Sequence, residues 1–444
     1  MLKKNDIINL TITDYDYDGF GISHLFEYTI FVKEALIGEE IEALVLRVTN
    51  NNIVFAKVLN IIKKSPNRIE PNCSYYHLCG GCNLLHMDYQ EELKFKEKTL
   101  KNTLNKMVKD IDIEPIIYNE NPFNYRNKIS LPIGFDGKFV VGFYQERSHN
   151  IIPSKSCLIE NKNARIIIDK ILQLFNESNL INQPDILRHL ILRSNLNDEF
   201  MMTIVVKKDT KEIRDIIDKL DDKMVKSIYL NINSRNDNVI LGDKFIHLKG
   251  DNHLLINVHN CKFKLHPNSF FQVNYHMMEK LYDKAIEFLE PTKEDVIIDA
   301  YSGTGSIGLS LSSKVKKVYG IEVVKEAVDN AKENAKINGI DNVEFILGKC
   351  ENEIDNLVNK KKIDAVIMDP PRKGSDQNFL NCLIKNQIKK IIYISCSPKT
   401  LARDLAYLKE NGYQIEHVVP VDMFSKTSNL ETVCALTNRA GSTK

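Results

Sequence analysis

Three cysteines lie close together in one glycine-containing loop. The segment reads Cys73, five residues, Cys79, two glycines and Cys82, and Cys157 follows far downstream. This spacing lets several thiolates converge on one centre without straining the backbone, whereas thiols that merely pack in a core are not usually gathered in this way. The spacing predicts a metal or cluster site. Because zinc also takes four cysteines, spacing alone does not identify the ion.

A second candidate site surrounds a glycine-rich turn. Residues 296–300 are an apolar run typical of a buried parallel strand, and the chain then turns through Gly303 and Gly305 into a helical pattern. Glycines at such a turn allow it to be tight and let a ligand approach the backbone. The next apolar run, residues 317–321, ends in Glu322, where a carboxylate can accept both ribose hydroxyls of a nucleotide. The pattern therefore predicts a nucleotide-binding turn.

A third apolar run, residues 364–368, ends in Asp369, which two prolines follow. A dinucleotide dehydrogenase has no need of an Asp-Pro-Pro tripeptide. The order of strand, glycine-rich turn, acidic strand end and Asp-Pro-Pro resembles the class I S-adenosylmethionine-dependent methyltransferases. This resemblance implies a Rossmann-like α/β catalytic domain, with S-adenosylmethionine rather than a nicotinamide as its cofactor.

Two later motifs narrow the resemblance. Residues 395–398 read Ser-Cys-Ser-Pro, and an Asp-Met-Phe segment at 422–424 leads through a polar loop to Glu431. With the cysteine loop, they resemble the RNA uracil-5-methyltransferases of the 23S rRNA 5-methyluridine type. The resemblance implies that Cys396 is the nucleophile and Glu431 the general base. Ser425 stands where that family usually has Pro, and Asn429 where it usually has His.

The same resemblance implies ligands for two cofactors. The implied contacts of S-adenosylmethionine are Gln272, Tyr301, Gly303, Gly305, Glu322 and Asp369. The implied ligands of a [4Fe-4S] cluster are Cys73, Cys79, Cys82 and Cys157. Asn274, two residues after Gln272, also fits a simple helix cap. The other cysteines, Cys261, Cys350, Cys382 and Cys434, lack such a context and are interpreted as structural.

The implied chemistry needs few groups. Position 5 of uracil is a poor nucleophile until a thiolate adds to C6 and turns C4–C5 into an enolate, which can attack a methyl group. A base must then remove the C5 proton so that the thiolate leaves. Arg372 is a candidate for neutralising a phosphate or the charge on O4. Because the target carbon is shielded in a stacked helix, the uridine must be extruded into the pocket.

Several elements must position these residues, and a chain of 444 residues suggests two to four domains. Short β-like runs in residues 1–62 predict a small barrel that resembles the OB-like TRAM module, an RNA-binding unit. Residues 63–262 are predicted as an α+β central domain with the cluster, and residues 263–444 as the methyltransferase domain. Helix 89–109 is a candidate for packing on the catalytic domain, and its lysines are predicted to form a solvated face.

Composition sets further limits. The formal net charge is +1, so any RNA-binding surface must come from local clusters of the 60 Lys and Arg residues. No apolar run approaches the roughly 20 residues that cross a bilayer, and the first residues lack the apolar core of a signal peptide. Nine cysteines argue for reduced thiols rather than a disulfide framework. We expect a soluble cytoplasmic protein, without membrane contact and monomeric.

These observations predict an enzyme that methylates C5 of a uridine in RNA. 23S rRNA is favoured because the cluster-bearing members of the resembled family mostly act on it, and tRNA is the second candidate. A non-catalytic RNA-binding or ribosome-assembly factor would have no reason to keep Cys396 and Glu431. An amino-group methyltransferase would want an aromatic residue in place of Arg372, and a cytosine-5 enzyme a second cysteine beside the Asp-Pro-Pro motif.

Overall fold

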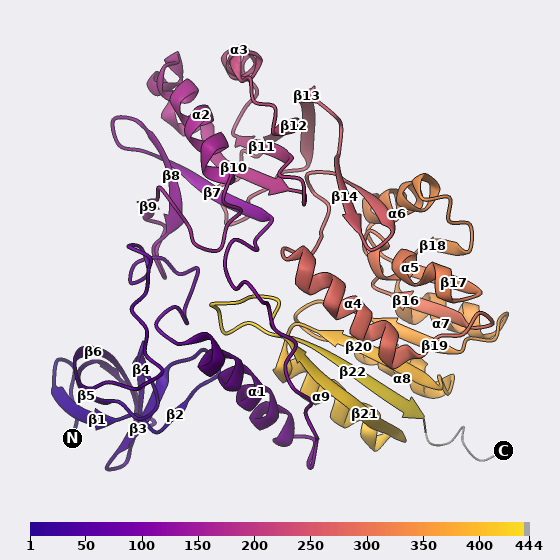
Figure 1. Cartoon of the computed structure of the whole chain (residues 1–444), viewed down its shortest axis with the longest axis horizontal. Coiled ribbons are helices and arrows are strands. Elements are labelled where there is room, and N and C mark those ends of the chain that lie inside the picture. The colour runs from indigo at the N-terminus through magenta and orange to yellow at the C-terminus, as the bar shows by residue number, and fades with distance from the viewer. Residues whose placement is uncertain (439–444) are drawn as a thin grey trace.

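The computed structural model describes residues 1–438, so the last residues of the predicted methyltransferase domain, 439–444, lie outside the described part. Three large sheets and one two-stranded hairpin follow one another along the chain. Figure 1 shows the first sheet at the lower left, the second at the top and the third at the right. Within residues 1–438 no helix has both the length and the apolar character of a membrane span.

The N-terminal sheet has six strands in the order β1-β5-β6-β4-β3-β2, of which only β4 and β6 run parallel. Its strands are β1 (Ile7–Thr11), β2 (Asp14–Tyr15), β3 (Gly21–Leu25), β4 (Tyr28–Lys33), β5 (Glu40–Val48) and β6 (Ile53–Lys63). Alternate residues such as Ile30, Val32 and Val45 are fully buried and form a core of their own. The period of two in the sequence therefore gives this sheet its inner face.

The central sheet has seven strands in the order β13-β12-β11-β10-β7-β8-β9. They are β7 (Lys128–Phe135), β8 (Phe139–Tyr144), β9 (Ile151–Pro153), β10 (Leu187–Ser194), β11 (Phe200–Val206), β12 (Val225–Ile232) and β13 (Lys244–Gly250). Apolar residues of α2 (Ala164–Asn176) and α3 (Lys211–Lys219), together with short 3-10 turns at Asn179–Asn182 and Pro184–Ile186, pack on one face. The opposite face carries Lys128, which pairs with Arg193 across the β7–β10 ladder.

The C-terminal sheet has the order β18-β17-β16-β19-β20-β22-β21, with its first five strands parallel and β22 antiparallel to both neighbours. Its strands are β16 (Val296–Ala300), β17 (Lys317–Glu322), β18 (Val343–Leu347), β19 (Ala365–Met368), β20 (Lys390–Ser395), β21 (Tyr413–Val421) and β22 (Glu431–Asn438). Its helices are α4 (Tyr275–Leu289), α5 (Ser306–Leu311, followed by a 3-10 turn at Ser312–Lys314), α6 (Lys325–Ile337), α7 (Cys350–Val358), α8 (Gln377–Lys385) and α9 (Pro398–Glu410).

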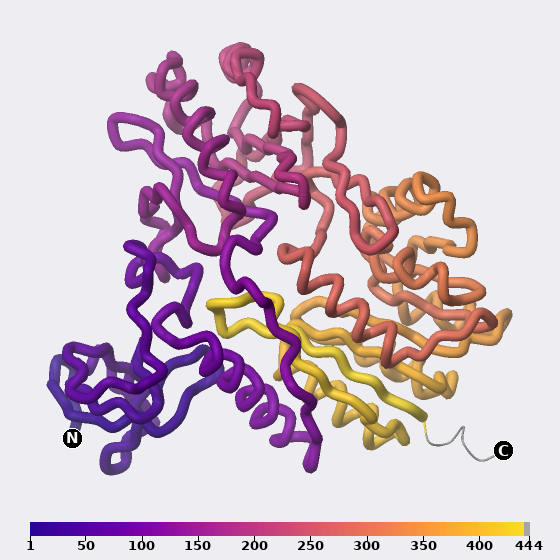
Figure 2. Tube along the Cα trace, in the orientation of Figure 1, coloured from indigo at the N-terminus to yellow at the C-terminus, as the bar shows by residue number. Residues whose placement is uncertain are grey.

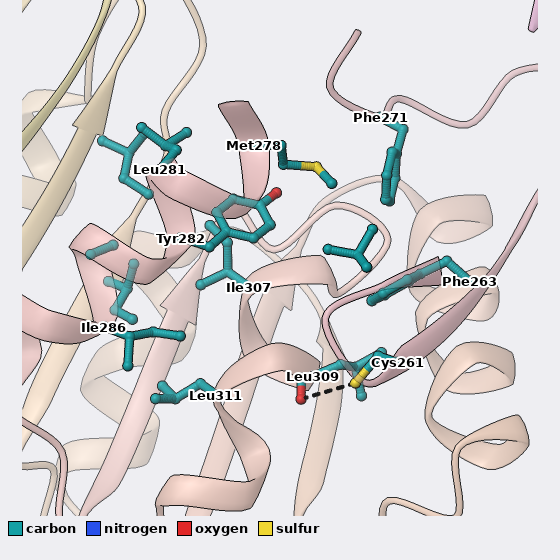
Figure 3. Close-up of a cluster of buried hydrophobic side chains, with 14 of the residues drawn as sticks. Cys261, Phe263, Phe271, Met278, Leu281, Tyr282, Ile286, Ile307, Leu309 and Leu311 are labelled. Carbon is teal, nitrogen blue, oxygen red and sulfur yellow. Dashed lines mark hydrogen bonds between the residues drawn. The ribbon is translucent and has the colours of Figure 1, made fainter. Parts of the chain in front are cut away.

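Helices cover both faces of the C-terminal sheet, which explains why its strands are apolar runs rather than alternating ones. One face packs on α4, α5 and α6, and the other on α7, α8 and α9. The hairpin of β14 (Leu254–Val258) and β15 (Cys261–Leu265) joins the first of these cores. Figure 3 shows Phe263 of the hairpin near Phe271, and the Cys261 thiol donating to the Leu309 carbonyl at 3.6 Å. The predicted boundary between residues 262 and 263 falls inside β15.

Helix α1 (Tyr89–Asn105) also packs on the C-terminal sheet, although it precedes the central sheet in sequence. Leu100 and Leu104 are fully buried in the same core as Leu401 and Leu405 of α9. In Figures 1 and 2, α1 crosses from the N-terminal sheet toward the yellow strands β21 and β22. The sequence predicts a helix over residues 89–109 as a candidate for this packing, and the structure has it ending at Asn105.

The prediction of a solvated lysine face on this helix is wrong for Lys96. The Lys96 ammonium is fully buried between the carboxylates of Glu92, at 2.8 Å, and Asp422, at 2.5 Å. Burial alone would lower the pKa of Lys96, but Glu92 and Asp422 outweigh it, so its pKa is raised and the ammonium stays charged. The ion pair ties α1 to the loop between β21 and β22, which leads to Glu431.

Polar contacts hold the rest of this loop. The Ser425 hydroxyl and the Tyr89 hydroxyl each donate to Asp422 Oδ2 at 2.6 Å. Ser425, which stands where the resembled family has Pro, thus restrains the loop by a hydrogen bond instead of a ring. Asn429, in the place of the usual His, is exposed, and its amide donates to Thr427 Oγ1 at 3.3 Å.

The loop is also clasped by residues next to the cysteines. Lys426 has a positive φ of 68° and is buried, with its ammonium 3.1 Å from Glu92 Oε2. Its carbonyl accepts the N–H groups of Asn83 and Leu84, both at 3.2 Å. The Asn83 amide donates to Ser428 Oγ at 3.0 Å and to the Asp18 carbonyl, in the N-terminal part, at 2.6 Å. The cysteine loop, the N-terminal sheet and the loop before Glu431 are therefore joined at one point.

We expect Lys96→Met to destabilise the protein by about 3–5 kcal/mol, because it leaves the buried carboxylate of Asp422 without a cation, while Glu92 keeps only Lys426. Urea unfolding followed by circular dichroism measures this loss. Lys98→Met is the matched control, since Lys98 pairs with Asp14 while half-exposed and such pairs contribute about 0–1 kcal/mol. Equal losses of unfolding free energy in the two variants would show that the buried ion pair of Lys96 does not stabilise the fold.

Candidate active site

The glycine-rich turn joins β16 to α5 and is left-handed at three positions, with φ of 63° at Tyr301, 53° at Gly303 and 81° at Gly305. A Cβ at Gly305 would lie 2.4 Å from the Phe345 ring, so only glycine fits there, whereas Gly303 faces open space. The Gly303 N–H donates to Glu322 Oε2 at 3.0 Å. The structure thus brings together four of the predicted cofactor residues and leaves room beside the turn.

Tyr301 belongs to the turn, and Gln272 comes from the segment before α4. The Tyr301 ring meets Phe379 edge-on at 5.6 Å, and its hydroxyl lies 3.4 Å from Ser375 Oγ. Gln272 is buried in the segment before α4, and its carbonyl accepts the Asn127 amide at 2.9 Å. Its own side-chain amide makes no hydrogen bond within residues 1–438. Asn274 caps α4 by accepting from the Met277 N–H at 3.3 Å.

Asp299, on β16 below the turn, was missed by sequence reasoning. Its Oδ2 accepts the Gly308 N–H at 2.9 Å, which closes α5 on the strand. Burial, with a further contribution from Asp369 and Glu322, raises the pKa of Asp299 to about 7. Its other oxygen has no hydrogen-bond partner in the described part of the chain. A carboxylate inside an apolar strand was the available signal.

Cys396, Glu431 and Asp369 meet at one edge of the C-terminal sheet. Ser395 of β20 pairs with Thr432 of β22, and this is the last pair of their antiparallel ladder. Cys396 follows Ser395 and Glu431 precedes Thr432, so the two residues lie at the same end of the ladder. Asp369 follows β19, the other neighbour of β20. Because β16 is also adjacent to β19, the same edge holds the glycine-rich turn. The fold therefore gathers residues that lie up to 130 positions apart in the sequence, as from Tyr301 to Glu431.

These groups titrate together. Burial, followed by the charges of Glu431 and Asp369, raises the pKa of the Cys396 thiol to about 11, and Arg372 opposes the shift. Burial raises the pKa of Asp369, and burial together with Asp369 raises that of Glu431 well above its ordinary value. Glu431 Oε2 has no hydrogen-bond partner among residues 1–438. These shifts favour the protonated thiol at neutral pH and oppose the ionisation of both carboxyl groups at once.

The four predicted cluster cysteines come from two segments that touch. Cys79 forms an isolated bridge with Gln145, and the backbone N–H of Lys155 donates to the Tyr75 hydroxyl at 3.0 Å. Burial raises the pKa of Cys82, and the other three thiols raise it further. No group of three or more His, Cys, Asp or Glu side chains that could hold a metal ion is present in the part of the chain that the structure describes.

Glu431→Gln should make the protein more stable at pH 8. The pKa of Glu431 is higher in the folded than in the unfolded chain, so stability is lost as pH rises from about 4.5 toward the folded pKa. Gln removes this loss, which amounts to about 1.4 kcal/mol per unit of pKa difference. Thermal unfolding at pH 5 and pH 8 should show a gain that shrinks at the lower pH. Glu344→Gln, on the exposed side of β18, is the control. If both variants change stability with pH in the same way, the raised pKa of the buried Glu431 beside Asp369 is contradicted.

Comparisons with known proteins identify relatives of this chain. Residues 88–439 match the model of the tRNA (uracil-5-)-methyltransferase family. An uncharacterized RNA methyltransferase of Clostridium tetani is 44% identical over 98% of this chain and 97% of its own length. Another, from Bacillus cereus, is 37% identical over 97% of this chain and 96% of its own.

One solved structure covers almost the whole chain. The tRNA (uracil-54, C5)-methyltransferase of Pyrococcus abyssi, in complex with S-adenosyl-L-homocysteine, is 28% identical and covers 97% of this chain and 99% of its own, with a TM-score of 0.78. The α/β methyltransferase fold and the predicted class of enzyme, an S-adenosylmethionine-dependent RNA methyltransferase, are confirmed. The chain belongs to the family of RNA uracil-5-methyltransferases.

Proposed function

We propose that this enzyme methylates C5 of a specific uridine in 23S rRNA through a covalent adduct between Cys396 and C6. The observation that carries the proposal is the meeting of a thiol and two buried carboxyl groups at one sheet edge, beside an open glycine turn. A non-catalytic RNA-binding factor has no use for such a cluster, because its raised pKa values lower stability at neutral pH.

S-adenosylmethionine supplies the methyl group when bound. Its proposed contacts are Gln272, Tyr301, Gly303, Gly305, Glu322 and Asp369. The open space at Gly303 and the unpartnered amide of Gln272 support this set, as does the bound S-adenosyl-L-homocysteine of the Pyrococcus abyssi enzyme. Glu322 already accepts three backbone N–H groups: Oε2 accepts from Gly303 in the turn, and Oε1 from Val323 and Val324, which follow Glu322.

The chain's own residues perform the proton and thiol steps. The Cys396 thiol gives its proton to water, its sulfur bonds to C6, and the π electron pair of the C5–C6 double bond moves into an enolate over C5, C4 and O4. C5 then takes the methyl group, and S-adenosyl-L-homocysteine is the leaving group. Glu431 accepts the C5 proton, the C5–H electron pair restores the C5–C6 double bond, and the C6–S bond breaks with its pair on sulfur to release Cys396 as thiolate. Arg372 opposes the rise in the pKa of Cys396 and of Glu431, so it favours the ionised forms that the cycle needs.

The identity of the RNA is the finer part of the proposal. 23S rRNA rests on the resemblance of the cysteine loop to that of the enzymes acting on the large ribosomal subunit. tRNA is the second candidate, favoured by the near-complete overlap with the Pyrococcus abyssi tRNA methyltransferase. In either RNA the target uridine must leave its stack to reach Cys396.

The proposed domains serve this substrate. Residues 1–62 form a TRAM barrel that binds RNA, residues 63–262 the central domain, and residues 263–444 the catalytic domain, to which α1 adds its packing. The β14–β15 hairpin packs with the catalytic core. By packing, therefore, the catalytic domain begins at or before Leu254 rather than at residue 263. We propose a monomer, and the nine free cysteines suit the reducing cytoplasm.

Cys73, Cys79, Cys82 and Cys157 are the proposed ligands of a [4Fe-4S] cluster. The donor set fits, because burial and then the other three thiols raise the pKa of Cys82, and bound iron would hold it as a thiolate. The cluster would brace the loop that ends in Asn83, which clasps the segment before Glu431. Its role here is structural, and no chemical step passes through it.

Expression of Glu431→Gln in cells should trap RNA on the enzyme. Gln cannot take the C5 proton, so the reaction stops after Cys396 has bonded to C6, and the adduct survives denaturing electrophoresis. Sequencing of the attached RNA then identifies the substrate as 23S rRNA or tRNA.

The control for this experiment is the Cys396→Ala variant, and the double variant with Glu431→Gln, neither of which can form an adduct. Methylation by Cys396→Ala would disprove the nucleophile. An adduct that contains only tRNA would replace rRNA by the second candidate.

The protein purified without oxygen should be brown and contain about four irons per chain. Cys79→Ser should lose the colour, because a cubane cluster needs all of its thiolate ligands. Cys261→Ser is the matched control, since this buried thiol only donates to the Leu309 carbonyl, and it should keep the colour. Elemental analysis that finds stoichiometric zinc in a colourless protein would contradict the cluster.

A further inference from the structure

Three cationic side chains gather at one end of the central sheet. Lys128 starts β7 and lies directly opposite Arg193 of β10, so the two side chains share a face. Arg126 lies two residues before Lys128, and its guanidinium Nε donates to the Lys128 carbonyl at 3.0 Å. The three residues are called the cation cluster below.

The cation cluster lacks a counter-charge. None of its members forms an ion pair with a residue in the described range 1–438. Arg193 is only 3% exposed, and while its Nη2 donates to the Ser269 carbonyl at 2.8 Å, its Nη1 has no acceptor. Burial, followed by the charges of Arg193 and Arg126, lowers the pKa of Lys128 to about 8, and no acidic group opposes them. Like charges held together in this way call for an anion.

The position of the cluster indicates which anion. Arg193 bonds to Ser269, and the Asn127 amide donates to the Gln272 carbonyl at 2.9 Å, so the cluster borders the segment that carries Gln272. Phe270, in the same segment, is 75% exposed. Arg126 and Lys128 are half-buried and form the accessible side, with Arg193 beneath them. The cluster therefore lies on the central sheet, outside the edge that gathers Cys396 and Glu431.

We propose that Arg126, Lys128 and Arg193 form a binding site for a phosphodiester group of the RNA strand, next to the extruded uridine. The inference rests on the proposed RNA substrate. Phosphate oxygens are pure acceptors that match guanidinium and ammonium donors, and a phosphate has no proton that would oppose the cluster. The carboxylate of S-adenosylmethionine is the competing anion, but the predicted contacts of this cofactor other than Gln272 lie at the C-terminal sheet.

The titration of Lys128 gives the test. In the free protein this lysine loses its proton near pH 8, whereas a bound phosphate holds the proton on. RNA binding should therefore take up a proton, and affinity should fall about tenfold from pH 7 to pH 9. Fluorescence polarisation with a short fluorescein-labelled single-stranded RNA of mixed sequence measures this fall. S-adenosylmethionine affinity, from calorimetry, is followed over the same range.

Three variants separate the explanations. Lys128→Arg keeps a charge that does not titrate, so it should bind as tightly as the wild type at pH 7 and show no fall by pH 9. Lys128→Gln should be weak and flat. Lys244→Gln, which changes an exposed lysine on β13 of the same sheet, should keep the wild-type profile.

The site is overturned if Lys128→Arg falls with pH as the wild type does, or if Lys128→Gln binds RNA normally at pH 7. It is also overturned if Lys128→Gln weakens S-adenosylmethionine and not RNA, since the anion would then be the cofactor's carboxylate. A wild-type protein that binds no RNA at any pH would overturn the proposed function together with this site. If only the phosphate site is disproved, the wild type still methylates RNA and the proposed function stands.

Discussion

The buried ammonium of Lys96 between Glu92 and Asp422 is the interaction on which the arrangement of the molecule depends. A charged group without water must keep its partners, because removal of either carboxylate leaves an uncompensated charge in the interior. The pair therefore fixes α1 against the loop between β21 and β22. Lys426, which shares Glu92 with Lys96, brings Asn83 and the cysteine loop to the same point. Segments more than 300 residues apart in the sequence are thus held together around Lys426, which lies shortly before Glu431.

This rigidity matters because the reacting groups are not held by strong contacts of their own. Glu431 has an oxygen without a hydrogen-bond partner, and its pKa is raised by burial and by Asp369. Such a group lowers stability at neutral pH, and strong hydrogen bonds to its charged form would lower its basicity. The surrounding loop supplies the positioning instead, through Asp422, Ser425 and Lys426.

The central sheet meets the cofactor region through backbone contacts. Asn127 bonds to the carbonyl of Gln272, Arg193 to that of Ser269, and the Tyr275 hydroxyl donates to the Ser194 carbonyl at 2.7 Å. A shift of β7 and β10 would therefore move the segment before α4. RNA bound on the central sheet and a cofactor bound at the C-terminal sheet would share this segment, which gives the two ligands a direct structural connection.

The sequence by itself determined the features that depend on local geometry. The left-handed turn at Gly303 and Gly305 and the strand ends at Glu322 and Asp369 follow from residue types a few positions apart, as do the α/β alternation and the short strands of the first 62 residues. The family motifs also placed Cys396 and Glu431 as candidates before any contact was known. Only the tertiary structure decided that Lys96 is buried rather than solvated, that Asp299 supports the turn, and that Ser425 replaces a proline with a hydrogen bond. The reason is physical: burial and charge pairing depend on groups such as Asp422 that are distant in sequence, and no local pattern around Lys96 reports them.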